Sequence, residues 1–221
     1  RPLHFLSKQC NEDAVEVLLD PRPIQEFVGS EFPLEPVVGK ARVAIVAQDC
    51  SQYRMDGADV GPTQEVHVWV AIRGPEDVRP VVGAERAMPT RTWFSLFTGS
   101  TDPRVREAKT APGTAQAPTE DVVLDAPGPR RRGRVSLGKD LVHSWSVSEA
   151  MPSSRLIGLN LDVHVREPSG NVVLNGTRAL MHLSTGPTKA TLTVVGGTDP
   201  PPSIGPGAYP VSETSFFPMW S

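Results

Sequence analysis

An unbroken alternation of apolar and polar side chains follows the Gly-Pro pair at residues 61–62 and continues to residue 73. Successive side chains of a β-strand point to opposite faces, so this pattern predicts a strand with two different faces. One face is an apolar, β-branched row, Val66, Val68, Val70 and Ile72. The other is a polar and aromatic row, Glu65, His67, Trp69 and Arg73. If the first row packs in a core, the second faces either bulk water or an enclosed, partly polar cavity.

The same kind of pattern, punctuated by proline and glycine, predicts about nine strands. They cover residues 41–48, 61–73, 89–97, 121–124, 133–137, 141–147, 156–166, 172–183 and 189–195. The best helix spans residues 102–109, because Asp102 suits the N-cap and Pro103 the first helical position. Two short apolar runs, at residues 3–6 and 14–19, are each interpreted as an edge strand or a helical turn. Residues 24–28 and 49–59 are predicted to be loops.

Short links between the predicted strands indicate mostly antiparallel pairing. A large open sheet would leave long unpaired edges, which natural proteins avoid. We therefore predict a mainly β fold, a closed or nearly closed antiparallel β-barrel with one or two short helices, with a double-sheet sandwich as the alternative. A single domain spans residues 1–221 and includes a Pro-rich C-terminal tail at about 198–221, which docks over the barrel mouth or onto a neighbouring subunit.

Composition narrows the classes of partner. The 221 residues carry a net charge of −3, with both signs spread along the chain, so we expect no nucleic-acid partner. The basic cluster at residues 130–134 is interpreted as a solvated loop or edge, with a phosphate-binding site as the alternative. No apolar run approaches the roughly 18 residues that span a bilayer, so no membrane partner is expected. Prolines number 23, about twice the usual share of roughly 5%, and lie between the predicted strands.

Cys10 and Cys50 are the only cysteines. Their spacing matches no metal-binding motif, and two cysteines make no disulfide framework. We therefore expect no metal site, no disulfide and a reduced, cytoplasmic protein.

Polar residues recur at two-residue spacing on three further predicted strands. Asp162, His164 and Arg166 form one such row, which we expect to face solvent. The candidates for ligand contact come from other strands and combine aromatic rings with polar groups. They are Trp69, Trp93, His143, Trp145 and Arg178. Strict alternation also places Trp93 and Phe97 on one face of their strand.

Three short segments resemble the acetoacetate decarboxylase superfamily. Residues 33–43 resemble its early loop and strand, and Gly61-Pro62-Thr63-Gln64-Glu65-Val66 resembles its Gly-Pro-Tyr-x-Glu strand start. Arg106-Glu107 resembles the Arg-Glu segment that precedes the family's catalytic lysine. The resemblance is distant and covers about residues 30–195. It implies a β-barrel in which Glu65 points into the cavity.

The catalytic lysine of that family is missing from this sequence. The family uses a desolvated lysine to form a Schiff base with a keto acid. Alignment on Arg106-Glu107 puts residues 113–116, Gly-Thr-Ala-Gln, at the expected place. Lys109 is near in sequence but falls on the predicted helix, where a solvated side chain is expected. We therefore expect the barrel to be kept and the Schiff-base nucleophile to be lost.

These observations favour a cofactor-free biosynthetic enzyme that cyclises or isomerises a hydrophobic ketonic or polyene intermediate, as in polyketide pathways. Glu65, with a pKa raised by its partly apolar surroundings, serves as general acid or base. His67 or His143 donates a hydrogen bond to a carbonyl, and tryptophans wall the cavity. The alternatives are a Schiff-base decarboxylase or aldolase using Lys109 or another lysine, and a non-catalytic ligand-binding barrel. The expected partner is a small hydrophobic organic substrate, and a homo-oligomer is left open.

Overall fold

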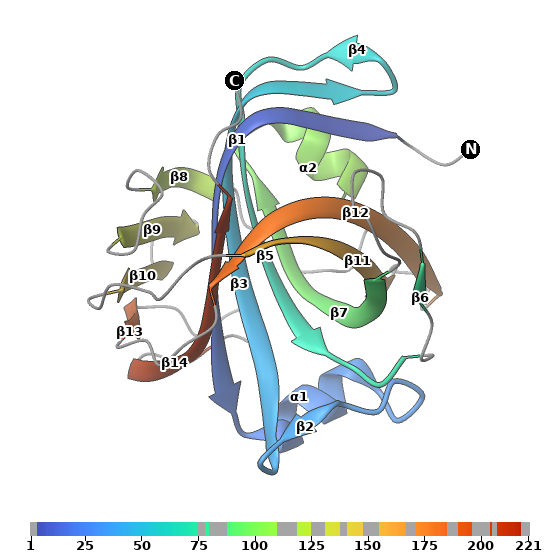
Figure 1. Cartoon of the computed structure of the whole chain (residues 1–221), viewed down its shortest axis with the longest axis vertical. Coiled ribbons are helices and arrows are strands. Elements are labelled where there is room, and N and C mark those ends of the chain that lie inside the picture. Colours follow the sequence, from blue (N-terminus) through green and yellow to red (C-terminus); the bar gives the residue numbers. More distant parts are fainter. Residues whose placement is uncertain are drawn as a thin grey trace.

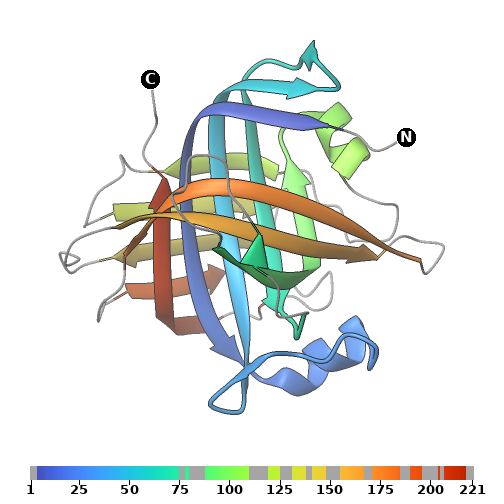
Figure 2. The same cartoon turned by 45° about the vertical axis from the view of Figure 1, so that its right-hand side comes forward.

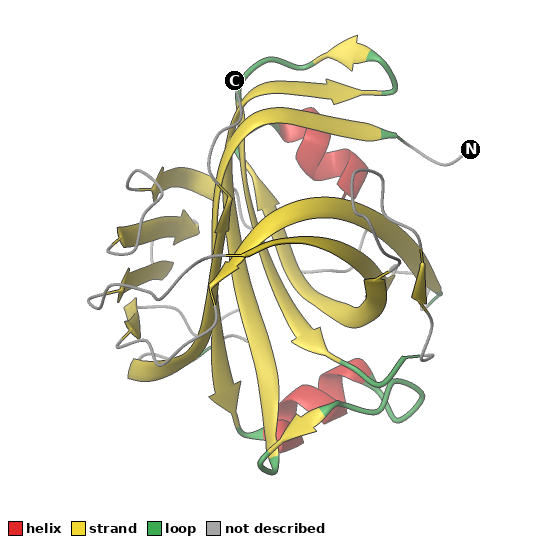
Figure 3. Ribbon diagram, viewed as in Figure 1, coloured by secondary structure: helices red, strands yellow, loops and turns green. Residues whose placement is uncertain are grey.

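The computed structural model describes residues 4–74, 78–79, 88–109, 119–124, 131–137, 141–147, 155–166, 171–184, 190–195, 204 and 207–217. Within these residues the chain forms 14 strands and two short helices (Figures 1 and 3). The strands are β1 (Phe5–Leu19), β2 (Pro36–Val37), β3 (Lys40–Met55), β4 (Ala58–Asp59), β5 (Thr63–Ala71), β6 (Val78–Arg79), β7 (Met88–Ser100), β8 (Thr119–Leu124), β9 (Arg131–Leu137), β10 (Leu141–Val147), β11 (Arg155–Arg166), β12 (Val172–Ser184), β13 (Ala190–Val195) and β14 (Gly207–Phe217). The helices are α1 (Pro21–Val28) and α2 (Pro103–Lys109). The predicted mainly β fold with one or two short helices is confirmed.

Hydrogen bonds link the strands in the order β1–β3–β5–β7–β11–β12–β14, and β14 also pairs with β1. From β14 the sheet continues through β13, β10 and β9 to β8. All these pairs are antiparallel except β7 and β11, which run parallel. The prediction of mostly antiparallel pairing is therefore confirmed, with this one pair as the exception. The chain between β7 and β11 contains α2 and three strands, a connection long enough for parallel pairing.

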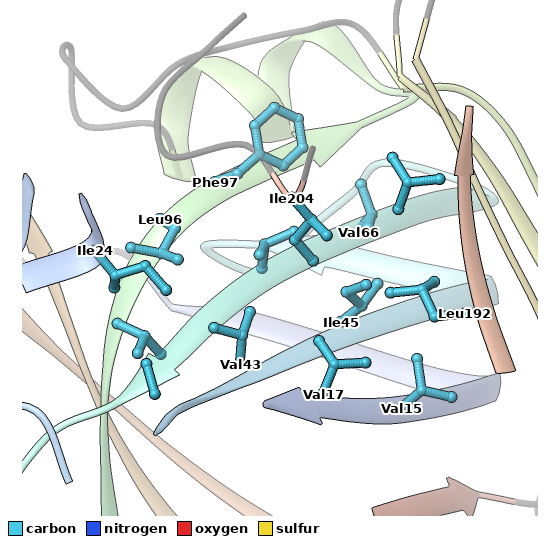
Figure 4. Packing of buried hydrophobic residues seen from close by; sticks show 14 of the residues in the cluster. Val15, Val17, Ile24, Val43, Ile45, Val66, Leu96, Phe97, Leu192 and Ile204 are labelled. Carbon is cyan, nitrogen blue, oxygen red and sulfur yellow. The ribbon is translucent and has the colours of Figure 1, made fainter. Parts of the chain in front are cut away.

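The main core lies on one face of the long strands β1, β3, β5 and β7. On that side the sheet is covered by the layer of β8, β9, β10 and β13 (Figures 1 and 2). Val43, Ile45 and Val66 of the central strands pack there with Leu192 of β13 (Figure 4). The predicted apolar row of β5 belongs to this core, with Val66, Val68, Val70 and Ile72 no more than 5% exposed.

A second core lies on the opposite face of the same strands. Ala44 and Val46 of β3 pack there with Trp93 of β7 and with Val163 and Val165 of β11. Strands β11 and β12 cross this side of the central layer (Figure 2). Both faces of β3 and β5 are therefore covered. Glu65 and His67 of the polar row are buried and Trp69 is half-buried, whereas Arg73, beyond the end of β5, is exposed.

The N-terminal segment is one long strand and not two short elements. In β1 and β3, Cys10 lies opposite Cys50, and the two cysteines form a disulfide with an S–S distance of 2.14 Å. The expectation that no disulfide forms is wrong. The two cysteines are 40 residues apart in sequence, and only the register of β1 on β3 brings them together.

Two segments predicted as loops are regular. Residues 24–28 belong to α1, which begins with two prolines in its first turn, where their missing N–H groups need no partner. The Asp20 side chain caps this helix by accepting a hydrogen bond from the backbone N–H of Arg22 at 3.0 Å. Residues 49–59 continue β3 to Met55 and form a hairpin with β4.

A β-bulge changes the faces predicted for β7. Val68 pairs with Phe97, but the next residue, Trp69, pairs with Ser95, so Leu96 is the extra residue. Trp93 consequently lies in the second core while Phe97 lies in the main core. The prediction that both share one face is wrong.

The described part of the predicted C-terminal tail is part of the sheet. Ile204 packs in the main core (Figure 4), and β14 pairs with β1, β12 and β13. In the portion of the chain that is described, neither helix has the length and apolar character needed to cross a bilayer.

Candidate functional site

Glu65 is a fully buried carboxyl group near the start of β5, with 0% of its surface exposed. In the sheet it lies between Gln48 of β3 and Ser100 of β7. It also interacts with Tyr53. Burial, the charge of Glu65 and a hydrogen bond with that carboxyl raise the pKa of the Tyr53 phenol far above its usual value. The phenol therefore stays protonated beside Glu65 across the physiological pH range.

A compact cluster closes this end of the sheet. Cys50, Tyr53 and Val105 of α2 are each at most 1% exposed and pack together. The Asp102 side chain caps helix α2, because its Oδ1 accepts from the backbone N–H of Val105 at 3.2 Å. The predicted N-cap is thus confirmed. The cluster keeps water away from the part of the sheet that carries Glu65.

His67 lies two residues further along β5 and is 7% exposed. Its imidazole stacks on Trp69, with ring centroids 5.1 Å apart and ring planes at 24°. Its Nδ1 lies 3.3 Å from the Oγ1 of Thr98, which in turn lies 3.4 Å from the Oγ of Ser95. The imidazole is therefore held both by its own strand and by a pair of buried hydroxyl groups on β7.

Two tryptophans continue this face. Trp69 is half-buried, and its ring centroid lies 6.5 Å from that of Trp93, which is 3% exposed. The guanidinium of Arg42 lies over the Trp93 ring, 5.2 Å from its centroid. Arg42 also pairs with Glu35 at 3.0 Å and with Glu16 at 3.8 Å.

The structure brings four of the seven predicted site residues together. Glu65, His67 and Trp69 follow one another on one face of β5, and Trp93 adjoins them from β7. The side chains of the other three, His143, Trp145 and Arg178, lie outside the described residues. Their strands are not neighbours of β5, because β10 pairs with β9 and β13, and β12 with β11 and β14.

The lysines that could act as a Schiff-base nucleophile lie outside the described part of the chain. Residues 113–116, which align with the lysine segment of the resembling family, are not described, and neither are the side chain of Lys109 or residues Lys139 and Lys189. The described residues contain no group of three or more His, Cys, Asp or Glu side chains that could hold a metal ion.

Four residues that contact the candidate site were not predicted from the sequence, namely Arg42, Tyr53, Ser95 and Thr98. The bulge in β7 hid the two hydroxyl residues, because strict alternation places Ser95 and Thr98 on opposite faces. Tyr53 falls in a segment predicted as a loop. Arg42 does not pair in the sheet with any predicted site residue. It reaches Trp93 of β7 from β3, across the intervening strand β5.

A second polar row was expected to face solvent and does not. Asp162 is 4% exposed, and the His164 ring packs 5.2 Å from Phe32 of the α1–β2 loop. Burial lowers the pKa of His164, although the nearby Asp162 opposes this. Arg166 donates to Glu31 at 2.9 Å and to the Val28 carbonyl, so it fastens α1 to β11.

Comparisons with known proteins identify the fold. No protein-family model and no curated protein matches the sequence. Among solved structures, the chain is similar to an acetoacetate decarboxylase-like enzyme from Sphingomonas wittichii RW1, with 10% identity, 97% of this chain and 88% of that chain covered, and a TM-score of 0.51. It is similar to an acetoacetate decarboxylase with 9% identity, coverage of 97% and 87%, and a TM-score of 0.51.

A third similar structure is the acetoacetate decarboxylase of Legionella pneumophila, with 11% identity, coverage of 97% and 85%, and a TM-score of 0.47. The two structures with the higher TM-scores show that the chain has the acetoacetate decarboxylase-like fold. The resemblance predicted from three short segments is confirmed at the level of the fold.

Proposed function

We propose that this protein is a cofactor-free enzyme that cyclises or isomerises a hydrophobic ketonic or polyene intermediate, as in polyketide-like natural product pathways. The observation that carries the proposal is the wholly buried carboxyl of Glu65, on the strand face that also carries His67 and Trp69. A buried ionisable group is costly to a fold and is commonly kept for chemistry.

In the proposed reaction the Glu65 carboxylate takes a proton from the carbon next to a substrate carbonyl. The electrons of that C–H bond form the enolate, and a hydrogen bond from His67 stabilises the charge on its oxygen. The enolate carbon then attacks a second carbonyl, whose oxygen takes the proton back from the carboxylic acid of Glu65, or a different carbon of the extended enolate takes that proton. The first route closes a ring and the second moves a double bond, and neither changes the molecular mass.

Enclosure of the substrate in a barrel would favour the ring-closing route. The strand pairings run from β1 through β3, β5, β7, β11 and β12 to β14, which pairs with β1, so the proposal includes a closed or nearly closed barrel. The flat rings of Trp69 and Trp93 would press a flexible chain into a folded conformation. Proximity alone lowers the barrier of such an intramolecular reaction by about several kcal/mol.

The first alternative is a Schiff-base decarboxylase or aldolase. It is favoured by the shared fold, since two of the similar proteins are named as acetoacetate decarboxylase or a decarboxylase-like enzyme. It needs a desolvated lysine, and the sequence has none at the aligned positions 113–116. The second alternative is a barrel that binds a ligand and does not transform it.

The wider setting of the reaction is also a proposal. The partner would be a small hydrophobic organic molecule, without nucleic acid or membrane, and a homo-oligomer stays open. A cytoplasmic location is an expectation from the sequence, and the Cys10–Cys50 disulfide argues against it because disulfides persist mainly in oxidising compartments.

Mass spectrometry distinguishes these functions directly. The purified protein is incubated with a panel of linear polyketones and polyenes and, separately, with acetoacetate. A product of unchanged mass and altered retention supports the proposal, whereas loss of carbon dioxide and a borohydride-trapped adduct on a lysine support the decarboxylase. Bound but unaltered compounds throughout the panel would favour the non-catalytic barrel.

A further inference from the structure

The indole N–H of Trp93 is a buried donor that has no partner among the described residues. The side chain is 3% exposed, and among the residues that the structure describes its Nε1 has no hydrogen-bond acceptor. Buried polar groups in folded proteins are almost always hydrogen-bonded, because leaving one unpaired costs stability. An orphaned donor in the ring that adjoins Trp69 therefore points to an acceptor that arrives with a ligand.

The ring that carries this donor is held rigidly. Arg42 lies over one face of the Trp93 ring at 5.2 Å, and the ring of Trp69 adjoins it at 6.5 Å between centroids. A stacked guanidinium and a neighbouring aromatic ring restrict the orientation of the indole. The N–H is thus fixed in direction before any ligand binds.

The charge around Trp93 decides which acceptor fits. Arg42 is the cation that lies over the ring, and it already pairs with two carboxylates, Glu35 at 3.0 Å and Glu16 at 3.8 Å. One guanidinium and two carboxylates leave this group with a net negative charge. An additional carboxylate from a ligand would be repelled, whereas a neutral carbonyl oxygen would not.

We propose that Trp93 is the carbonyl anchor of the site, and that the ligand is an apolar molecule presenting a neutral ketone or ester oxygen to the indole N–H, not a hydrocarbon and not a carboxylic acid. Glu65 and His67 precede Trp69 on the same face of β5. The anchored carbonyl therefore lies at the end of this face that Trp93 occupies, and the rest of the ligand extends along β5 towards Glu65. Of the two substrate classes in the proposed function, this inference favours the ketonic one over the polyene. It rests on the proposed function for the location of the ligand.

The test compares three naphthalene probes of nearly equal size, acetylnaphthalene, ethylnaphthalene and naphthoate, by isothermal titration calorimetry. Wild type should bind the ketone about five- to tenfold more tightly than the hydrocarbon, the gain of one hydrogen bond. It should bind naphthoate most weakly. Trp93→Phe should remove the preference for the ketone over the hydrocarbon. Phe97→Leu, on the same strand but in the main core, should preserve it.

A second measurement needs no variant. The four tryptophans give four indole N–H resonances in a proton–nitrogen correlation spectrum. The Trp93 resonance should move downfield with the ketone and not with ethylnaphthalene, because hydrogen bonding deshields the proton.

Equal binding of ketone and hydrocarbon, tightest binding of naphthoate, or binding of none of the three probes overturns the inference. So does a ketone preference that survives in Trp93→Phe. These outcomes concern binding alone, so they are distinguishable from a failure of the proposed function. That failure would appear as unaltered compounds in the mass assay, whatever the probe affinities.

Discussion

The imidazole of His67 stacks on the indole of Trp69, its neighbour at two-residue spacing on β5, with centroids 5.1 Å apart. The same imidazole reaches across to β7, where its Nδ1 lies 3.3 Å from the Thr98 hydroxyl. Contacts from two strands leave the ring little freedom to rotate. A rigidly held imidazole next to a buried carboxyl is well suited to orient a substrate, because supporting contacts decide how well a site is positioned.

Removal of the Thr98 hydroxyl should weaken the fold and loosen His67. Thr98→Val keeps the shape of the side chain but deprives Nδ1 and Ser95 of a hydrogen-bond partner, so the free energy of unfolding should fall by about 1–2 kcal/mol. Thr98→Ser keeps the hydroxyl and should lose less than half of that. Urea unfolding measures both variants, and equal stability of Thr98→Val and wild type would contradict the hydrogen bond.

The Cys10–Cys50 disulfide should contribute substantially to stability. It links residues 40 apart in sequence, so it restricts a long loop of the unfolded chain. Loop-closure estimates give about 3–4 kcal/mol for a loop of this size. Urea unfolding with and without a reductant, together with a thiol count, measures the effect. Two free thiols in the untreated protein would show that the bond does not form.

This disulfide also shows where sequence reasoning stops. Alternation predicts strands at 41–48 and elsewhere, but it gives no partner and no register for them. Cys10 meets Cys50 only because β1 is a single strand paired along most of β3. Helix α1 was missed for a different reason. Its residues 24–28 were predicted as a loop, although the first turn of a helix tolerates the two prolines that begin it.

Val38 should be a position where substitution stabilises the protein. It forms, with Gly39, the two-residue turn between β2 and β3, at φ 50° and 93% exposed. A β-branched residue is strained in the left-handed region, where Asn is tolerated. Val38→Asn should therefore raise the free energy of unfolding by about 1 kcal/mol. Urea unfolding checks this, with Val38→Ala as a control that should gain less, and a destabilised Asn variant would contradict the turn geometry.

The Tyr53 phenol should resist ionisation in the folded protein. Its pKa is raised by burial and by Glu65, whereas the unfolded chain has a value of about 10. The contribution of this pKa difference to the free energy of unfolding is therefore fully present below about pH 10. Above that pH, each further pH unit should lower the free energy of unfolding by about 1.4 kcal/mol until the folded phenol itself ionises.

Absorbance of the phenolate measures this in a Tyr209→Phe background, which leaves Tyr53 as the single tyrosine. Glu65→Gln should lower the pKa of Tyr53, because the neighbouring charge is removed. The exposed control Glu26→Gln should leave it unchanged. A Tyr53 pKa that is insensitive to Glu65→Gln would disprove the interaction between the two residues.

Only the part of the candidate site that lies on a single strand could be predicted from the sequence. Alternation in β5 places Glu65, His67 and Trp69 on one face, and the structure bears this out. Asp162 shows the opposite case. Its strand also alternates, yet both faces are covered, because loop and helix segments near Phe32 pack on the side expected to meet water. Burial of a second face depends on which elements lie above it, and no local pattern encodes that.

The acid–base role of Glu65 is tested most directly by comparing the turnover of Glu65→Gln with that of wild type. The substrate is the compound from the polyketone and polyene panel that wild type converts. We expect kcat to fall by about 10²- to 10⁴-fold, the usual contribution of a general acid or base. Glu26→Gln makes the same chemical change at an exposed position of α1 and should keep full activity. Unchanged turnover in a folded Glu65→Gln protein would contradict the assignment of Glu65 as the acid–base group.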